Sequence, residues 1–94
     1  MDIQKIMKKS IYKAKGGLIR IKIKGEDKIE KIVITGDFFF YPENELENLE
    51  KYLIGTKISE EEVYKSIKKF YKEKNIESPG LNPEDLTKAI ILTK

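Results

Sequence analysis

The sequence contains neither cysteine nor histidine. Without cysteine there is no disulfide, no thiolate metal ligand, no iron–sulfur ligation and no cysteine nucleophile. Without histidine the chain lacks the commonest metal ligand and the side chain that most readily exchanges protons near neutral pH. Catalytic triads and histidine-bound zinc are therefore excluded within these 94 residues. Carboxylate, lysine, tyrosine and hydroxyl groups remain for chemistry.

Long apolar runs are also missing. No stretch approaches the roughly 20 residues of a membrane-spanning helix, and residues 1–5 lack the apolar segment of a secretory leader. We therefore expect a cytoplasmic protein with no membrane partner. A length of 94 residues, with 39% hydrophobic and 37% charged side chains, suits a single domain over residues 1–94 with one modest core.

A dominant charge of one sign is lacking as well, since 19 Lys and Arg against 16 Asp and Glu leave a net charge of +3. The charges are unevenly spread. Residues 1–24 carry eight basic and one acidic side chain, whereas residues 25–62 carry four basic and eleven acidic ones. This polarity suits docking to a charged protein surface. It is weaker than the dense basic footprint of a nucleic-acid-binding protein, so no nucleic-acid partner is expected.

A β-hairpin is predicted over residues 18–35. Residues 18–24 alternate isoleucine with basic side chains, which is the period of a half-buried strand. Residues 25–28 have the composition of a tight turn, and the β-branched residues 29–35 form the returning strand. Residues 11–15 are compatible with an additional edge strand, and residues 1–10 carry no decisive pattern.

A first helix is predicted to begin after Pro42 and to end at Gly55. Four aliphatic side chains at helical spacing would form its inward face: Leu46, Leu49, Leu53 and Ile54. Its acidic residues would remain in solvent and near the positive end of the helix dipole.

Two more helices follow. Ser59 and Glu62 form a capping box, which predicts a second helix from about Glu60 that ends before residue 78. Its inward face would comprise Val63, Ile67, Phe70 and Tyr71, with Ile58 stapled to Val63. Asn82 as N-cap and Pro83 at the first helical position predict a third helix. Its inward residues would be Leu86, Ala89, Ile90 and Thr93. The sequence thus predicts an α+β fold with three helices on one face of a small antiparallel sheet.

The sharpest local feature is the aromatic run that follows Gly36 and Asp37. Neighbours in an extended segment face opposite sides, so the four aromatics cannot all enter one core. One interpretation places Phe38 and Phe40 in the core and leaves Phe39 and Tyr41 half covered. The other makes Phe39 and Tyr41 an exposed partner-binding patch before Pro42. Gly36 is expected to adopt an unusual backbone conformation. Asp37 would accept backbone N–H bonds in the turn or contact a basic partner group.

Residues 13–17 combine Lys13 and Lys15 with Gly16 and Gly17. Glycines free backbone amides and lysines add positive charge, as in loops that contact phosphate. The Walker spacing is missing, however, and no helix directly follows the glycines. An ordinary turn into the strand is the simpler interpretation. The lysines of the second helix, Lys65, Lys68, Lys69 and Lys72, are read as a solvated face.

Four segments together resemble a known family: residues 13–19, 34–43 and 80–85, and the end of the first predicted helix at residues 53–55. They are similar to the C-terminal accessory domain of lipoate protein ligases over about residues 11–92. The most specific part is the motif Gly36-Asp37-Phe38-Phe39 with Pro42-Glu43.

The resemblance implies a function. Lipoate protein ligases adenylate lipoate with ATP and Mg²⁺ and then transfer the lipoyl group to a lysine of lipoyl carrier domains. The small domain, whose family fold resembles sulfur-transfer and iron–sulfur scaffold proteins, would be a non-catalytic subunit needed by the catalytic subunit for adenylation. No catalytic or metal-binding residue, cofactor or independent activity is implied for this chain. Residues implied at the partner interface, or in closing the active site, are Lys13, Lys15, Gly16, Gly17, Gly36, Asp37, Phe39, Tyr41 and Pro42.

Two other hypotheses stay open on the sequence. A free-standing basic module that binds nucleic acid or protein would use the lysine-rich first 24 residues and the lysines of the second helix, although the acidic middle third would repel phosphate. A regulator that binds lipoylated proteins directly is the other. Co-purification with a ligase catalytic subunit would separate these three possibilities.

Overall fold

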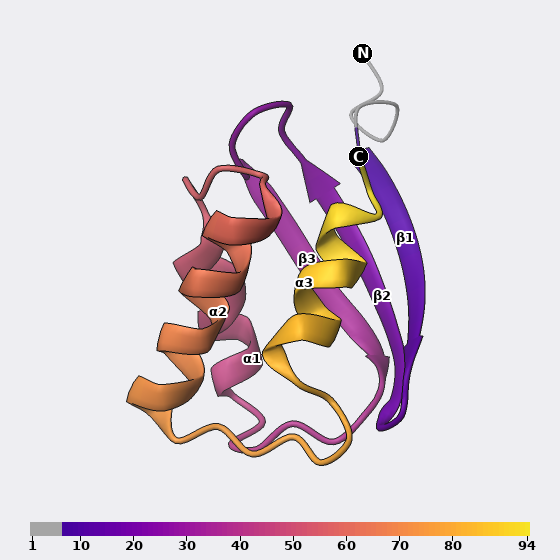
Figure 1. The fold of residues 1–94 in the computed structure, drawn as a ribbon, viewed down its shortest axis with the longest axis vertical. Coiled ribbons are helices and arrows are strands. Elements are labelled where there is room, and N and C mark those ends of the chain that lie inside the picture. The colour runs from indigo at the N-terminus through magenta and orange to yellow at the C-terminus, as the bar shows by residue number, and fades with distance from the viewer. Residues whose placement is uncertain (1–6) are drawn as a thin grey trace.

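The computed structural model describes residues 7–94, so residues 1–5, which are expected to lack a secretory leader, lie outside the described part of the chain. Three strands form an antiparallel sheet in the order β1-β2-β3: β1 (Met7–Ala14), β2 (Gly17–Lys24) and β3 (Lys31–Asp37). The helices α1 (Glu45–Leu53), α2 (Glu60–Lys74) and α3 (Pro83–Ile91) follow and cover one face of the sheet (Figure 1). The predicted α+β fold is confirmed. Over residues 7–94, no helix has the length and apolar character needed to cross a membrane.

The predicted hairpin is formed by β2 and β3, which pair from Leu18 opposite Asp37 to Lys24 opposite Lys31. The predicted second strand begins too early at residue 29. The N–H of Ile29 donates to the carbonyl of Thr56, and the Ile29 carbonyl accepts from Gly55. Ile29 is therefore hydrogen-bonded to the segment between α1 and α2 instead of to β2, and β3 begins two residues later.

The additional edge strand is also present and is longer than predicted. β1 pairs along β2 from Met7 opposite Lys24 to Ala14 opposite Gly17. Its first half was not predicted, because consecutive Lys8 and Lys9 interrupt the apolar alternation. The hydroxyl of Ser10 donates to a carbonyl of α3, which ties this strand to the helical layer.

The helices meet the sheet through one continuous apolar core. Sheet side chains in it include Ile19, Ile21, Ile23, Ile32 and Ile34, and helical ones include Leu49, Leu53, Val63, Ile67, Phe70, Leu86, Ala89 and Ile90. Thr93 is buried as predicted, and Thr87 is buried in addition. The predicted burial of Ile54 is wrong, since 53% of this residue is exposed. α1 ends at Leu53, and Ile54 already has extended backbone angles.

Both predicted helix starts are confirmed. The side chain of Ser59 accepts a 3.3 Å hydrogen bond from the backbone N–H of Glu62 at the start of α2. At the start of α3 the Asp85 carboxylate accepts a 2.8 Å bond from the N–H of Asn82. These contacts satisfy amides that have no partner within the helix, so each helix begins at a defined residue.

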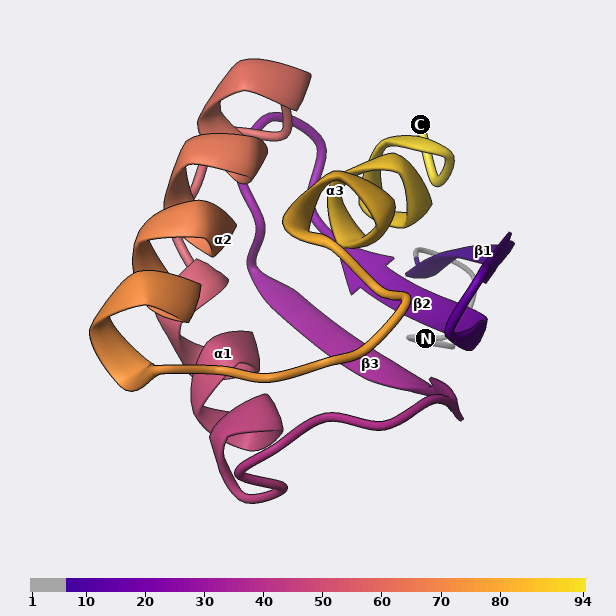
Figure 2. The ribbon, with the colours of Figure 1, turned by 60° about the horizontal axis from the view of Figure 1, so that its bottom comes forward.

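Over the described part of the chain, one face of the sheet is covered by helices, and the other is not. Figure 2 shows α3 lying over β1 and β2, while α1 lies beside β3. The N–H of Ile34 in β3 donates a 2.7 Å bond to the Glu50 carboxylate of α1, which satisfies a backbone group on that side of the sheet. No helix or strand within residues 7–94 covers the opposite face.

Candidate partner-binding site

The turn between β1 and β2 packs against the loop that precedes α3. The N–H of Gly16 donates a 2.7 Å hydrogen bond to the carbonyl of Gly80. A Cβ on Gly16 would lie 2.3 Å from the carbonyl oxygen of Pro79, so no side chain fits at this position. Residues 15–16 and 79–80, far apart in the sequence, are thus in backbone contact.

Gly17 and Gly36 allow β2 and β3 to approach closely at the same end of the sheet. Their φ angles are 137° and 147°, in the region that favours glycine. A Cβ on Gly17 would lie 1.7 Å from the Asp37 carbonyl oxygen, and one on Gly36 would lie 2.0 Å from that of Leu18. The predicted unusual conformation of Gly36 is confirmed. The close approach of the two strands therefore explains the presence of both glycines without a bound phosphate.

The aromatic run alternates between core and surface. Phe40 is buried and meets the ring of Tyr71 edge to face, with centroids 5.9 Å apart. Phe38 is half-buried against Phe40. Phe39 and Tyr41 are 56% and 54% exposed, and their rings stack at 6.3 Å with an angle of 8° between planes. Phe39 and Tyr41, here named the aromatic pair, thus form a flat apolar surface on the outside of the molecule.

The backbone of the aromatic pair is held in place. Tyr41 and Glu77 exchange two N–H···O hydrogen bonds of 2.8 Å each, which form an isolated antiparallel bridge. Pro42 follows and is half-buried. Asp37 is exposed, and its carboxylate accepts no hydrogen bond from residues 7–94, so the predicted N–H contacts in the turn are absent. The charge of Asp37 is instead open to solvent.

A hydrogen-bond chain stabilises the loop that bears Gly80. Ser78 donates its hydroxyl proton to the Leu81 carbonyl at 2.6 Å, so the Tyr71 hydroxyl donates to Ser78 at 2.7 Å. Burial raises the pKa of Tyr71, and the negative charge of Asp85 raises it further. The phenol therefore acts as a neutral donor that fixes the loop.

Two hollows flank these elements. One, of about 340 Å³, is lined by Tyr12, Lys13, Ala14, Lys15, Gly80, Asn82 and Asp85. The other, of about 360 Å³, is lined by residues of β3, of the aromatic run and of the start of α1, including Gly36 and Phe39. Lys13 and Lys15 are exposed beside the first hollow. The predicted site residues therefore lie around one end of the sheet.

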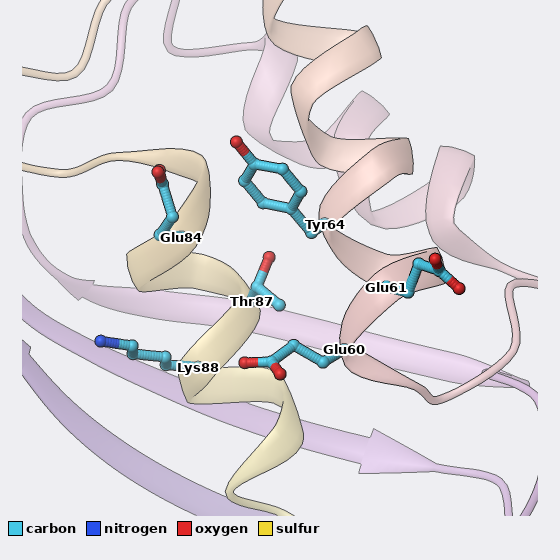
Figure 3. A pocket seen from close by; sticks show the side chains of 6 residues that line it. All are labelled: Glu60, Glu61, Tyr64, Glu84, Thr87 and Lys88. Atoms are coloured by element: carbon cyan, nitrogen blue, oxygen red, sulfur yellow. The ribbon is translucent and has the colours of Figure 1, made fainter.

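A third hollow, which the sequence did not predict, lies between α2 and α3. Its volume is about 300 Å³, and its lining residues are Glu60, Glu61, Tyr64, Glu84, Thr87 and Lys88. Figure 3 shows Glu60 and Tyr64 on the side of α2 that faces α3, whereas Glu61 points away. The proton of the Thr87 hydroxyl is already used in a hydrogen bond to the Pro83 carbonyl. Among residues 7–94 no group of three or more acidic side chains could hold a metal ion.

Comparison with known proteins relates this arrangement to one family. Residues 4–90 match the family model described as bacterial lipoate protein ligase C-terminus. The chain belongs to this family. It is 39% identical over 80 residues to lipoate-protein ligase A subunit 2 of Thermoplasma acidophilum, a match that covers 84% of this chain and 82% of that protein.

A solved structure extends the relationship to the fold. It describes a bi-partite lipoate protein ligase and its E2 lipoyl domain from Thermoplasma acidophilum, an archaeal lipoylation system. One of its chains superposes on this lipoate protein ligase C-terminal domain with a TM-score of 0.80 and 38% identity. The superposition covers 89% of this chain and 93% of that chain. The resemblance inferred from the residues at positions 36–43 is therefore confirmed, and a nucleic-acid-binding module is not favoured.

Proposed function

We propose that this chain is the accessory, non-catalytic subunit of a two-chain lipoate protein ligase. It acts with a catalytic subunit in the ATP-dependent adenylation of lipoate that precedes transfer to lipoyl carrier domains. The observation that carries the proposal is the 39% identity to a protein that is itself a ligase subunit, over 84% of this chain. ATP, Mg²⁺ and lipoate are assigned to the catalytic subunit.

The aromatic pair supports the proposal physically. Exposed aromatic side chains that lie flat and fixed are typical anchors of protein interfaces. Phe39 and Tyr41 meet this description because their rings stack and the Tyr41 backbone is bonded to Glu77. Lys13 and Lys15, exposed next to the nearby hollow, would add positive charge at the edge of the same interface. This end of the sheet is the proposed docking site for the catalytic subunit.

A subunit without a nucleophile can still promote adenylation. By covering the active site of its partner it excludes water, which would otherwise hydrolyse the acyl-adenylate. It also holds partner loops in the conformation that binds both substrates. The backbone contacts of Gly16 and Tyr41 give the docking surface the rigidity that such a role requires. The proposed contribution is therefore to closure and positioning rather than to bond chemistry.

The two half-reactions test this proposal separately. Lipoate-dependent pyrophosphate release by the catalytic subunit is measured with and without this chain, and the chain is expected to be required. Transfer from preformed lipoyl-adenylate, at saturating carrier domain, is expected to depend on it much less. An equal dependence of both steps would contradict a role in adenylation. Pyrophosphate release that is complete without the chain would contradict the accessory function altogether.

A further inference from the structure

The face of the sheet without helices is strongly basic. Side chains alternate along a strand, so Arg20, Lys22 and Lys24 of β2 lie opposite the buried isoleucines. The registers place Lys9 of β1 beside Lys22 and Lys31 of β3 beside Lys24. The basic face is defined as Lys9, Lys13, Arg20, Lys22, Lys24 and Lys31. The one acidic residue at an outward position of these strands is Asp37, at the end of β3.

This arrangement opposes the stability of the sheet. Lys9 is directly opposite Lys22, and Lys24 is directly opposite Lys31. Like charges in directly opposed positions are destabilising. Among the described residues the basic face has one ion pair, between Lys24 and Glu30, and its atoms are 3.9 Å apart. An ion pair near the surface contributes little free energy, so it offsets little of the repulsion between the lysines. Packing within the sheet therefore does not account for the basic face, whereas an acidic partner would relieve the repulsion.

Apolar side chains lie among these charges. Ile11 is 64% exposed and is opposite Arg20, and the half-buried Leu18 is opposite Lys13. Val33, also half-buried, is opposite Lys22. Apolar side chains next to charged ones are compatible with a protein interface. The face has no outward aromatic ring on which a base could stack, and five of its six cations are lysine, which lacks the bidentate fork of arginine. A protein is thus favoured over nucleic acid.

The two surfaces of this chain suit two kinds of partner. The aromatic pair is compact and pre-positioned, as expected for a lasting subunit contact. The basic face is dominated by charge. Charge complementarity raises the association rate of two proteins, and their complex can still dissociate quickly. In a two-chain ligase, the protein that accepts the lipoyl group has to arrive and leave in every turnover. We propose that the basic face docks an acidic surface of this acceptor protein. The inference rests on the function proposed above.

Charge reversal in the reconstituted two-chain ligase tests the proposal. The face variant is Lys9→Glu/Lys22→Glu/Lys31→Glu. Its three residues are exposed and do not belong to the proposed docking site for the catalytic subunit. The matched control, Lys65→Glu/Lys69→Glu/Lys72→Glu, makes the same charge change on exposed positions of α2. Transfer from preformed lipoyl-adenylate is measured against the concentration of the apo acceptor domain at several ionic strengths. Circular dichroism establishes that both variants are folded.

The KM for the acceptor is expected to rise about tenfold or more in the face variant at low salt. This difference from wild type should shrink as salt increases, because exposed charges are screened. The control variant should keep the wild-type KM. Adenylation involves no acceptor and should be unchanged in both variants.

Three results would overturn the proposal. The first is a KM for the acceptor that changes equally in both variants or changes in neither of them. The second is loss of adenylation or of catalytic-subunit binding in the face variant, which would place the basic face in the subunit contact. The third is micromolar binding of a single-stranded oligonucleotide that only the face variant loses, with an unchanged KM. Failure of the accessory function is separate, since it appears as pyrophosphate release that wild-type chain does not stimulate.

Discussion

The N–H of Gly16 donates a 2.7 Å hydrogen bond to the carbonyl of Gly80, which joins the β1–β2 turn to the loop before α3. A methyl group on Gly16 would approach the Pro79 carbonyl oxygen to 2.3 Å, so the two backbones would have to separate. Gly16→Ala is therefore expected to lower the free energy of unfolding by about 1–3 kcal/mol. Denaturant titration measures this loss. Lys15→Ala, in the same turn but exposed, is the control and should change it by less than about 0.5 kcal/mol.

The aromatic pair should affect association and not folding. Phe39→Ala/Tyr41→Ala is expected to weaken binding to the catalytic subunit by about 2–4 kcal/mol, with a much smaller change in melting temperature. Phe40→Ala, between the two in the sequence, removes a buried ring and should cost about 3–5 kcal/mol of stability. Calorimetric titration and thermal melts measure the two quantities. A double variant that binds as tightly as wild type would show that this surface is not the docking site.

The buried phenol of Tyr71 should make stability depend on alkaline pH. Its pKa is raised by burial, so the folded chain keeps this proton at pH values where the unfolded chain has lost it. The unfolded state then binds fewer protons, and stability falls as the pH rises above about 10. Tyr71→Phe lacks this decline. Its deficit at neutral pH, about 0.5–1.5 kcal/mol from the lost Ser78 hydrogen bond, should therefore narrow at alkaline pH.

Ser78→Ala is the matched control for this pH dependence. It removes the same hydrogen-bond partner but retains the titrating phenol, so its alkaline decline should persist. Urea titrations between neutral pH and about pH 11 compare the three proteins. A Tyr71→Phe variant whose deficit stays constant over this range would show that the phenol does not contribute to the pH dependence.

The isolated chain is expected to have no ligase activity and no micromolar affinity for ATP or lipoate. The physical reason is that the proposed function places the substrate pocket in the catalytic subunit, which this chain would only cover. Isothermal titration with each small molecule, on the chain alone and on the two-chain complex, measures the difference. Tight binding of either compound by the chain alone would refute the accessory assignment.

Local signals explain which elements the sequence predicts well. The alternation of Ile19, Ile21 and Ile23 identifies β2, because a half-buried strand requires this period. The caps at Ser59 and Asn82 identify the helix starts, because each capping signal spans only a few neighbouring residues. The start of β3 could not be predicted in this way. It depends on hydrogen bonds between Ile29 and residues 55–56, which are distant in the sequence.

The candidate site divides in the same manner. Alternation in an extended segment is local, and it left Phe39 and Tyr41 either half covered or exposed, with Phe40 in the core. In the structure Phe40 is buried and both Phe39 and Tyr41 are exposed. The contact of Gly16 with Gly80 has no local signal, because it arises only when two loops meet. The hollow between α2 and α3 was missed for the same reason. Its carboxylates at the start of α2 are fully explained, in the sequence, by the helix dipole.

The short connection between α2 and α3 links two parts of the proposed docking surface. Glu77 in this connection is bonded to Tyr41, and Gly80, three residues later, is bonded to Gly16. Any displacement of α3 relative to α2 has to pass through these few residues. It would carry the aromatic pair and the β1–β2 turn with it. The connection is thus a mechanical linkage that couples the spacing of α2 and α3 to the position of the proposed docking surface.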